Sequence, residues 1–269
     1  MKLIVCMLSA LVLLCGCASG PTANPRDPLE PFNRGVFRFN DAVDQAVLKP
    51  VATAYRDVLP TPVRRGVANF FGNLEDAWSF VNNTLQLKGE AAADSLARFG
   101  VNTLFGLGGV LDVASEMRIE KHSKDFGHTL GYWGVAPGPY LVLPLLGPSS
   151  LRETVALPVD MQGDIVGHIA HVPTRNTLIV VRAIDTRAEL LKASAMLEQA
   201  ALDRYTFTRD AYLQRRRSSV YDGNPPEEKT GDIWPAQQDL AEPQAETAPE
   251  TEPETLIKAG LPGDGKDQP

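Results

Sequence analysis

Apolar residues recur along much of the chain at the spacing of one helix face. The clearest stripe begins after Pro62, a residue suited to the first turn of a helix, and runs over residues 63–85. Its members include several bulky aromatic residues: Val63, Val67, Phe70, Phe71, Leu74, Ala77, Trp78, Val81 and Leu85. The opposite face is polar: Arg64, Arg65, Asn69, Asn73, Asp76 and Asn83. This spacing predicts an amphipathic helix with a wide apolar face.

The flanking segments also follow a helical period. A stripe runs from Phe32 to Val47, and Pro50 predicts a break after it. Further helices are expected over about 90–105, 123–133, 174–197 (with Thr174 as the cap) and 200–219. Residues 134–148 alternate Gly and Pro with Leu, Val and Tyr, which allows at best a short strand or hairpin. The pattern predicts an all-α fold with one irregular Gly/Pro-rich hairpin or loop.

The first residues resemble an export signal. Lys2 supplies a positive charge, and Leu3 to Leu14 form an apolar run that is too short to span a bilayer. The tetrapeptide Leu-Cys-Gly-Cys that ends at Cys17 resembles a bacterial lipobox, in which only a thiol can accept a thioether-linked diacylglycerol. We therefore expect residues 1–16 to be a lipoprotein signal peptide and 17–27 a linker that is lipidated at Cys17. The alternative is an ordinary signal peptide with incidental cysteines.

Charge divides the chain unevenly. The formal net charge is −7, but the residues from Asp222 onward hold 12 acidic and 3 basic side chains and eight of the 21 prolines. A segment of this composition cannot bury enough apolar surface to fold. We therefore expect a folded body at 28–221, close to neutral, and a disordered tail at 222–269. No basic stripe with interleaved aromatic residues indicates nucleic-acid binding.

Two arrangements are compatible with such helices. After the signal, the sequence holds no run of eighteen apolar residues that would predict a transmembrane helix. Broad amphipathic helices can either pack a water-soluble core or lie in the membrane interface. The residue pattern by itself favours the soluble core.

Several strings in the body resemble one family. In order, they are DPLEPFNR at 27–34, FRFN at 37–40, KPVA at 49–52, NFFGNL at 69–74, RFGVNT at 98–103, GLGGVLDVA at 106–114, DFGHTL at 125–130, GPYLVLP at 138–144 and GP at 147–148. With the lipobox, they identify the chain as resembling the MlaA (VacJ) family of outer-membrane lipoproteins. The resemblance covers about 28–221. Residues 115–122 depart from the family pattern, and the tail lies outside it.

The resemblance implies a ring of interfacial helices around an amphipathic channel. It implies a lipid-anchored protein on the periplasmic side of the outer membrane. Such a protein removes mislocalised phospholipids from the outer leaflet, passes them to a periplasmic lipid carrier and so maintains membrane asymmetry. A trimeric porin is the further partner implied. The alternative function is that of a structural, porin-associated lipoprotein without lipid transfer.

Candidate chemistry in the body is sparse. His168 and His171 have a spacing that could place two ligands on one helix face, but no further ligand joins them. Glycines 106–109 lack the Lys-Ser/Thr of a phosphate loop, and Ser149 lies in no Gly-x-Ser-x-Gly elbow. We therefore expect no enzyme, no metal and no cofactor other than the covalent lipid on Cys17.

The remaining candidates concern lipid contact. A lipid path or gate is expected near two flexible segments: Gly106, Gly108 and Gly109, and Gly138, Pro139 and Tyr140. Static turns are the alternative for these glycines. The candidate membrane-facing residues are Phe70, Phe71, Leu74 and Trp78. Residues Arg215 to Arg217 are expected to end a helix, where cations suit the helix dipole; contact with anionic headgroups is the alternative.

Overall fold

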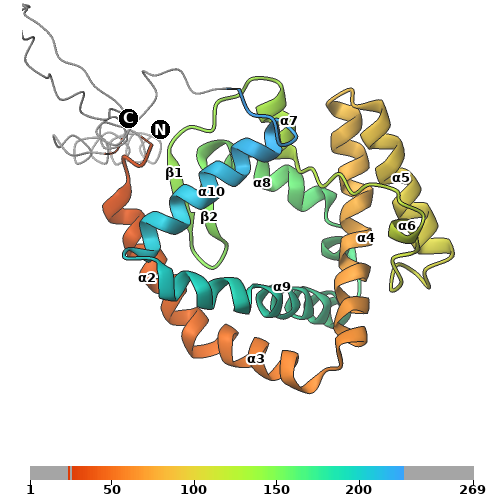
Figure 1. Ribbon diagram of the computed structural model, residues 1–269, viewed down its shortest axis with the longest axis horizontal. Helices are drawn as coiled ribbons and strands as arrows, with labels where there is room; N and C mark the ends of the chain where they lie inside the picture. Colours follow the sequence, from red (N-terminus) through yellow and green to blue (C-terminus); the bar gives the residue numbers. More distant parts are fainter. Residues whose placement is uncertain (1–23, 25, 227–269) are drawn as a thin grey trace, which may run out of the picture. The chain divides into compact units, whose positions relative to one another are not determined.

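A computed structural model of the chain describes residue 24 and residues 26–226. The predicted signal peptide, Cys17, most of the linker and residues 227–269 of the predicted tail lie outside the described residues. The described part is mainly helical with one small hairpin (Figure 1), which confirms the predicted fold class. The helices follow one another around a circuit rather than stacking in layers.

The first helical stretch is continuous through Pro50. Helix α2 (Glu30–Val43) passes through a π-helical turn, η1 (Asp44–Leu48), into α3 (Lys49–Val58). The predicted break at Pro50 is therefore wrong. The N–H of Lys49 donates to the carbonyl of Asp44, and the wider turn places Pro50 in the first turn of α3, where its missing N–H costs little.

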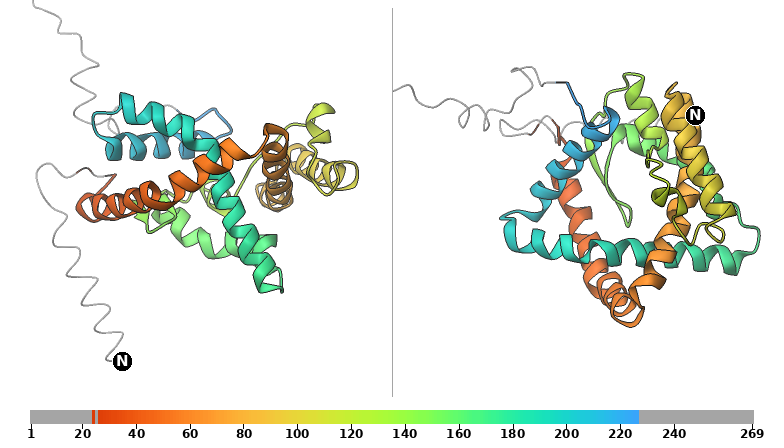
Figure 2. Two further views of the ribbon diagram at one scale, coloured as in Figure 1. Left: turned by 90° about the horizontal axis from the view of Figure 1, so that it is seen from below. Right: turned by 45° about the vertical axis from the view of Figure 1, so that its right-hand side comes forward.

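Two long helices form an antiparallel pair. Helix α4 (Thr61–Leu85) carries Pro62 in its first turn, and α5 (Gly89–Leu104) returns beside it, as Figures 1 and 2 both show. Both match the predicted helices at 63–85 and 90–105. Residues 105–112 form the loop after α5, and the one-turn helix α6 (Val113–Glu116) follows.

The hairpin comes next in the chain. Helix α7 (Phe126–Tyr132) precedes β1 (Tyr140–Leu143), which pairs antiparallel with β2 (Gly147–Ser150) so that Tyr140 faces Ser150. Helix α8 (Leu151–Gly163) then begins at Ser150, whose side chain accepts from the N–H of Glu153. The sequence pattern did not predict α8, which contains Pro158 and has no clear apolar stripe. A 3₁₀ turn, η2 (Ile165–His168), ends this part.

Two helices complete the described residues, namely α9 (Val172–Ala200) and α10 (Arg204–Val220). The predicted cap of α9 is wrong by three residues, because the side chain of His171 accepts from the N–H of Thr174. After α10, the carboxylate of Asp222 forms ion pairs with Lys88 and Lys124. The residues that the structure describes continue to 226.

Burial is inverted relative to a water-soluble protein. Among the described residues, buried polar and charged side chains outnumber buried apolar ones, and many large apolar side chains are exposed. Helix α4 shows this clearly, because Asn73, Asp76 and Asn83 are buried on the face that the sequence pattern assigned to the outside. The soluble-core interpretation of the apolar stripes is therefore not supported.

Within residues 26–226, no helix combines the length and the apolar character that crossing a membrane requires.

Candidate functional site

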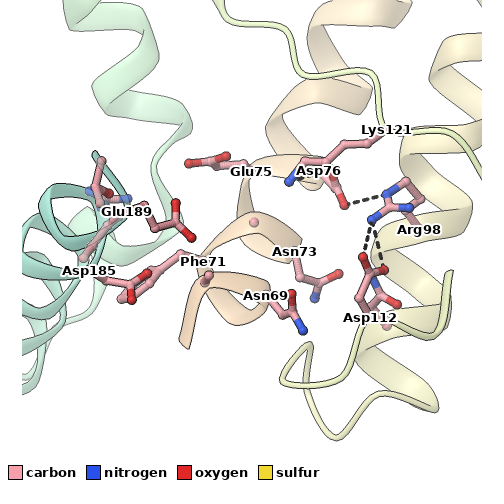
Figure 3. Close-up of a pocket in the computed structure, with 15 residues that line it drawn as sticks. Asn69, Phe71, Asn73, Glu75, Asp76, Arg98, Asp112, Lys121, Asp185 and Glu189 are labelled. Carbon is pink, nitrogen blue, oxygen red and sulfur yellow. Dashed lines mark hydrogen bonds and ion pairs between the residues drawn. The ribbon is translucent and has the colours of Figure 1, made fainter. Parts of the chain in front are cut away.

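A cavity of about 300 Å³ lies beside α4, with α9 on one side and α5 and the segment 112–121 on the other (Figure 3). Charged side chains dominate its walls. They comprise five carboxylates and three cations: Glu75, Asp76, Asp112, Asp185 and Glu189, with Arg98, Lys121 and Arg182. A cavity with this lining selects polar, charged ligands.

Arg98 organises one wall of the cavity. Its guanidinium is buried and donates to Asp76 (Nε–Oδ2, 3.2 Å), to Asp112 (Nη2–Oδ1, 3.0 Å) and to the carbonyl of Ile119 (2.8 Å). The amide of Asn102 joins the same network, donating to Asp112 (3.2 Å) and accepting from the N–H of Ala114 (2.8 Å). Two strings quoted for the family resemblance, 98–103 and 106–114, therefore meet at this wall.

Asp76 is only 1 % exposed. Burial raises the pKa of its carboxyl group, and Lys121 and Arg98 oppose that effect without reversing it. The Lys121 ammonium lies 3.9 Å from Asp76 Oδ1 and passes over Gly72, where an added Cβ would come within 2.8 Å of Nζ. Gly72 therefore gives this lysine its path across α4.

The opposite wall is acidic. Asp185 on α9 is buried and accepts a hydrogen bond from the hydroxyl of Tyr55 (2.8 Å). Glu189, one turn further along α9, and Glu75 on α4 extend toward the space between the two helices (Figure 3). Burial raises the pKa of Glu189, and the charges of Asp185 and Glu75 raise it further.

An exposed apolar surface lies outside the cavity, at the end of α5. Leu104, Phe105 and Leu107 are 78 %, 71 % and 74 % exposed. Leu111 and Met117 nearby in the chain are also exposed. Large exposed apolar side chains that are close together in the chain are typical of a segment that contacts a membrane or a protein partner.

The four candidate membrane-facing residues on α4 do not share one environment. Phe71 is buried, packs edge-to-face on Phe70 and lines the cavity, so it does not face a membrane in this structure. Trp78 is half-buried and its indole N–H donates to Asp160 (2.8 Å). Phe70 and Leu74 are also half-buried, and their contact with lipid stays a prediction.

The first group of candidate gate glycines lies in a tightly packed turn. A Cβ on Gly106 would approach the carbonyl oxygens of Leu111 and Asn102 within 2.2 and 2.5 Å. Gly109 (φ +95°) lies against the side chain of Asn73, whereas Gly108 (φ +73°) has open space around it. This turn therefore borders the cavity wall, and only Gly108 has room to change.

The second group of candidate gate residues belongs to a different part of the fold. Gly138 (φ +66°) lies against Leu151, and Pro139 accepts through its carbonyl from the N–H of Leu151 (3.0 Å). Tyr140 is completely buried and packs with Val142 and Tyr205. Tyr140 therefore does not border an open path here, and the structure does not bring the two glycine groups together in one site.

Asn33 fixes the hairpin to α2. Its side-chain amide donates to Asp27 (2.8 Å) and to the carbonyl of Tyr140 (3.0 Å), and its oxygen accepts from the N–H of Val142 (2.9 Å). All of these residues belong to the strings at 27–34 and 138–144.

Arg216, the central residue of the 215–217 cluster, belongs to an internal network. It forms two hydrogen bonds with Asp125 (2.7 and 3.0 Å) and also pairs with Glu153. Headgroup contact through Arg216 is therefore not supported. His168 lies in η2 and His171 caps α9, so the two do not share a helix face.

In the part of the chain that the structure describes, no three His, Cys, Asp or Glu side chains are grouped so as to hold a metal ion.

Sequence reasoning missed the cavity residues. A sequence signal existed for Arg98 and Asp112, because each is a charged residue within a mainly apolar string, at 98–103 and 106–114. The meeting of Asp185 and Glu189 with Glu75 joins positions more than a hundred residues apart, and no local pattern signals it.

A family model for the MlaA lipoprotein matches residues 25–219. The chain is 39% identical over 220 residues to the intermembrane phospholipid transport system lipoprotein MlaA of Escherichia coli (strain K12), covering 77% of this chain and 86% of that protein. The protein of the same name from Haemophilus influenzae is 34% identical over 241 residues, covering 85% and 94%.

One solved structure is also similar. Its description reads "Structural basis for maintenance of bacterial outer membrane lipid asymmetry", and it matches with a TM-score of 0.64 and 37% sequence identity. The match covers 74% of this chain and 99% of the solved chain.

Proposed function

Because the chain belongs to the MlaA lipoprotein family, we propose that it is the outer-membrane lipoprotein of an intermembrane phospholipid transport system. It maintains the lipid asymmetry of the outer membrane and is not an enzyme. It does so by offering phospholipids a polar route through the helical domain, which removes them from the outer leaflet and delivers them to a periplasmic lipid carrier.

The inverted burial of the helical domain carries this proposal. Large apolar side chains such as Phe105 lie outside, and a charged cavity with Asp76 and Arg98 in its walls lies inside. A lipid-facing exterior needs apolar surface, because acyl chains cannot satisfy polar groups. A headgroup needs a polar surface along its route, because moving an ionised group through an apolar medium is very costly.

The lipid anchor is part of the same proposal. The lipobox at residues 14–17 supports acylation of Cys17. Several acyl chains at about 0.8 kcal/mol per buried CH₂ hold a protein permanently at a membrane. The protein is therefore anchored on the periplasmic side of the outer membrane, with its helices in the inner leaflet and a trimeric porin as its membrane partner.

Complementation tests the function. We expect the chain, expressed in a Gram-negative strain that lacks its own MlaA lipoprotein, to lower the amount of outer-leaflet phospholipid. That amount is measured by labelling headgroup amines with a reagent that does not cross the membrane. The Cys17→Ser variant is the control, because it cannot be acylated. Unchanged labelling at normal protein levels contradicts lipid transfer.

The same strain separates the alternative function. A structural, porin-associated lipoprotein co-purifies with a trimeric porin but leaves outer-leaflet phospholipid at the level of the deletion strain. The proposed lipid-transfer function predicts the same co-purification together with a decrease in outer-leaflet phospholipid, so the phospholipid measurement decides between the two.

A further inference from the structure

The acidic wall of the cavity holds carboxylates that form no direct ion pair with the cavity cations. Among the cavity cations, Arg98 is held by Asp76 and Asp112, and Arg182 is held by Asp164 (2.7 Å), outside the cavity. Within residues 26–226, no cation lies at ion-pair distance from Glu75, Asp185 or Glu189. Three carboxylates therefore share one side of the cavity without a direct ion pair. The cations that act on them do so at longer range: Arg182 on Glu75, Arg64 on Asp185 and Lys121 on Glu189.

The residues that line the cavity differ in burial. Glu75 and Glu189 are exposed, Asp185 is 5 % exposed, and Asn73 and Asp76 are 2 % and 1 % exposed. The cavity therefore offers carboxylates to solvent and leads to buried polar groups.

Two of the buried oxygens lack hydrogen bonds. In the described part of the chain, no donor lies within hydrogen-bond distance of Asn73 Oδ1 or Asp76 Oδ1, although both residues line the cavity. The amide nitrogen of Asn73 is already used, because it donates to Thr103 (2.9 Å). A buried acceptor without a hydrogen bond destabilises the fold, and a ligand that supplies the donor removes that cost. Both atoms are acceptors without a hydrogen bond, although Lys121 forms an ion pair of 3.9 Å with Asp76 Oδ1. A donor bound in the cavity would satisfy them.

We infer that this cavity is a binding site for a primary ammonium group, held by Glu75, Asp185 and Glu189 at the acidic wall with the buried acceptors beyond. The inference rests on the proposed function in one respect, namely that the ammonium is the headgroup amine of a phospholipid. A primary ammonium carries three N–H donors and one positive charge, which matches carboxylates and unpaired oxygens.

Other cations fit the cavity less well. A quaternary ammonium has no N–H to donate to Asn73 or Asp76, and such groups are bound by aromatic cages, whereas this cavity is lined by one aromatic residue, Phe71. A divalent metal ion needs several ligand oxygens at 2.0–2.6 Å. No such grouping occurs among the described residues. The volume of about 300 Å³ suits a headgroup rather than a whole lipid.

Lys121 adds a positive charge to the site, which can bind an anionic part of the ligand. Its ammonium lies 3.9 Å from Asp76 Oδ1, beyond hydrogen-bond length, and its side chain is 40% exposed. A ligand ammonium that hydrogen-bonds Asp76 frees Lys121 to meet an anion. The phosphate next to a headgroup amine is such an anion.

Binding of short-chain lipids tests the inference. We expect full-length lipidated protein in a nonionic detergent to bind dihexanoyl phosphatidylethanolamine about tenfold more tightly than dihexanoyl phosphatidylcholine or phosphatidylglycerol, measured by calorimetry. This follows from one charge-assisted hydrogen bond more than the other headgroups make. In the Glu75→Gln/Glu189→Gln double variant we expect the preference to fall to within twofold. Both side chains are exposed and without ion pairs, so the double variant should fold normally.

The matched control is Glu90→Gln, which removes an exposed carboxylate of α5 outside the cavity and should keep the tenfold preference. Equal binding of all three lipids by the wild-type protein, or an unchanged preference in the double variant, overturns the ammonium site and leaves lipid transport intact. Loss of phosphatidylethanolamine binding on adding calcium at equal concentration also overturns it, because the carboxylates then bind a metal ion.

Binding of soluble O-phosphoethanolamine tests the ammonium site independently of lipid transport. If this compound binds the wild-type protein about tenfold more tightly than the double variant while none of the three lipids binds, the ammonium site stands and the proposed lipid transport fails. If phosphatidylglycerol and phosphatidylcholine bind, but O-phosphoethanolamine and phosphatidylethanolamine bind no more tightly than they do, the proposed lipid transport stands and the ammonium site fails.

Discussion

Replacing one exposed and one buried phenylalanine separates contact with lipid from stability of the fold. Phe105 is 71 % exposed at the end of α5, whereas Phe71 is 6 % exposed beneath α9. If the exterior of the domain contacts hydrocarbon, Phe105→Ala should weaken membrane partition and leave folding almost unchanged. Phe71→Ala should destabilise the fold and affect partition little.

The exposed fraction sets the size of the first effect. An aromatic side chain has roughly 200 Å² of surface, so the exposed part of Phe105 is about 140 Å². At about 25 cal/mol per Å², and allowing for the methyl group that remains, its transfer into hydrocarbon contributes about 2–3 kcal/mol. This corresponds to a loss of roughly a hundredfold in partition coefficient.

For the buried residue Phe71, the expected effect is a loss of folding stability. Removing a buried phenylalanine side chain costs about 3–5 kcal/mol. For a domain of this length, each kcal/mol lowers the melting temperature by about 2–4 °C, so we expect a decrease of about 6–20 °C for Phe71→Ala.

Both variants are measured in a form that begins at Ala18 and therefore lacks the acylated cysteine. Partition is measured by co-sedimentation with phospholipid vesicles, and stability by circular dichroism during heating. The reasoning is refuted if Phe105→Ala partitions like the wild type but melts at a much lower temperature, because Phe105 would then be part of a folded core or interface.

The remaining predictions concern acid stability, the anchor and the turn after α5. Burial acts to raise the pKa of Asp125, but hydrogen bonds from His128 and Arg216 hold that pKa well below its ordinary value. The contribution of this carboxylate to the stability of the fold is therefore complete above about pH 4 and is lost as the pH falls below that value. The melting temperature should fall between pH 6 and pH 3 by less in Asp125→Asn than in the wild type, and an identical fall rules this carboxylate out. Arg216→Gln leaves the Asp125 charge partly unpaired and should cost about 3 kcal/mol in chemical unfolding at pH 7; a change under 1 kcal/mol contradicts a structural role for this arginine. Cys17→Ser should abolish incorporation of labelled palmitate, and continued labelling disproves the lipobox. Gly108→Val, strained at φ +73° but free of steric contact, should raise outer-leaflet phospholipid and detergent sensitivity at normal protein levels, whereas wild-type resistance would leave Gly108 as a static turn.

The helical period predicts where helices lie but not which face is buried. For α4 the stripe gave nearly the observed bounds, yet Asn73 and Asp76 are buried and Val63 is exposed. An amphipathic pattern states that two faces differ, and the environment of the protein decides which one faces inward. The family resemblance supplied that information, and the residues by themselves favoured the wrong alternative.

Other features escaped prediction for local reasons. A π-helical turn at 44–48 changes the spacing by one residue, so the sequence predicts a break at Pro50 that the helix does not have. Helix α8 contains Pro158 and has no strong apolar stripe, so the helical spacing of apolar residues does not predict it. The cavity depends on contacts between α4 and α9 that only the tertiary fold creates.

The exposed apolar residues at the end of α5 have a consequence for the behaviour of the folded domain in water. Leu104, Phe105 and Leu107 are exposed in the folded domain, so folding does not remove them from water. Such a surface promotes self-association in an aqueous compartment. The folded domain should therefore stay monomeric in water only while another apolar surface, from a lipid or a protein, covers these side chains.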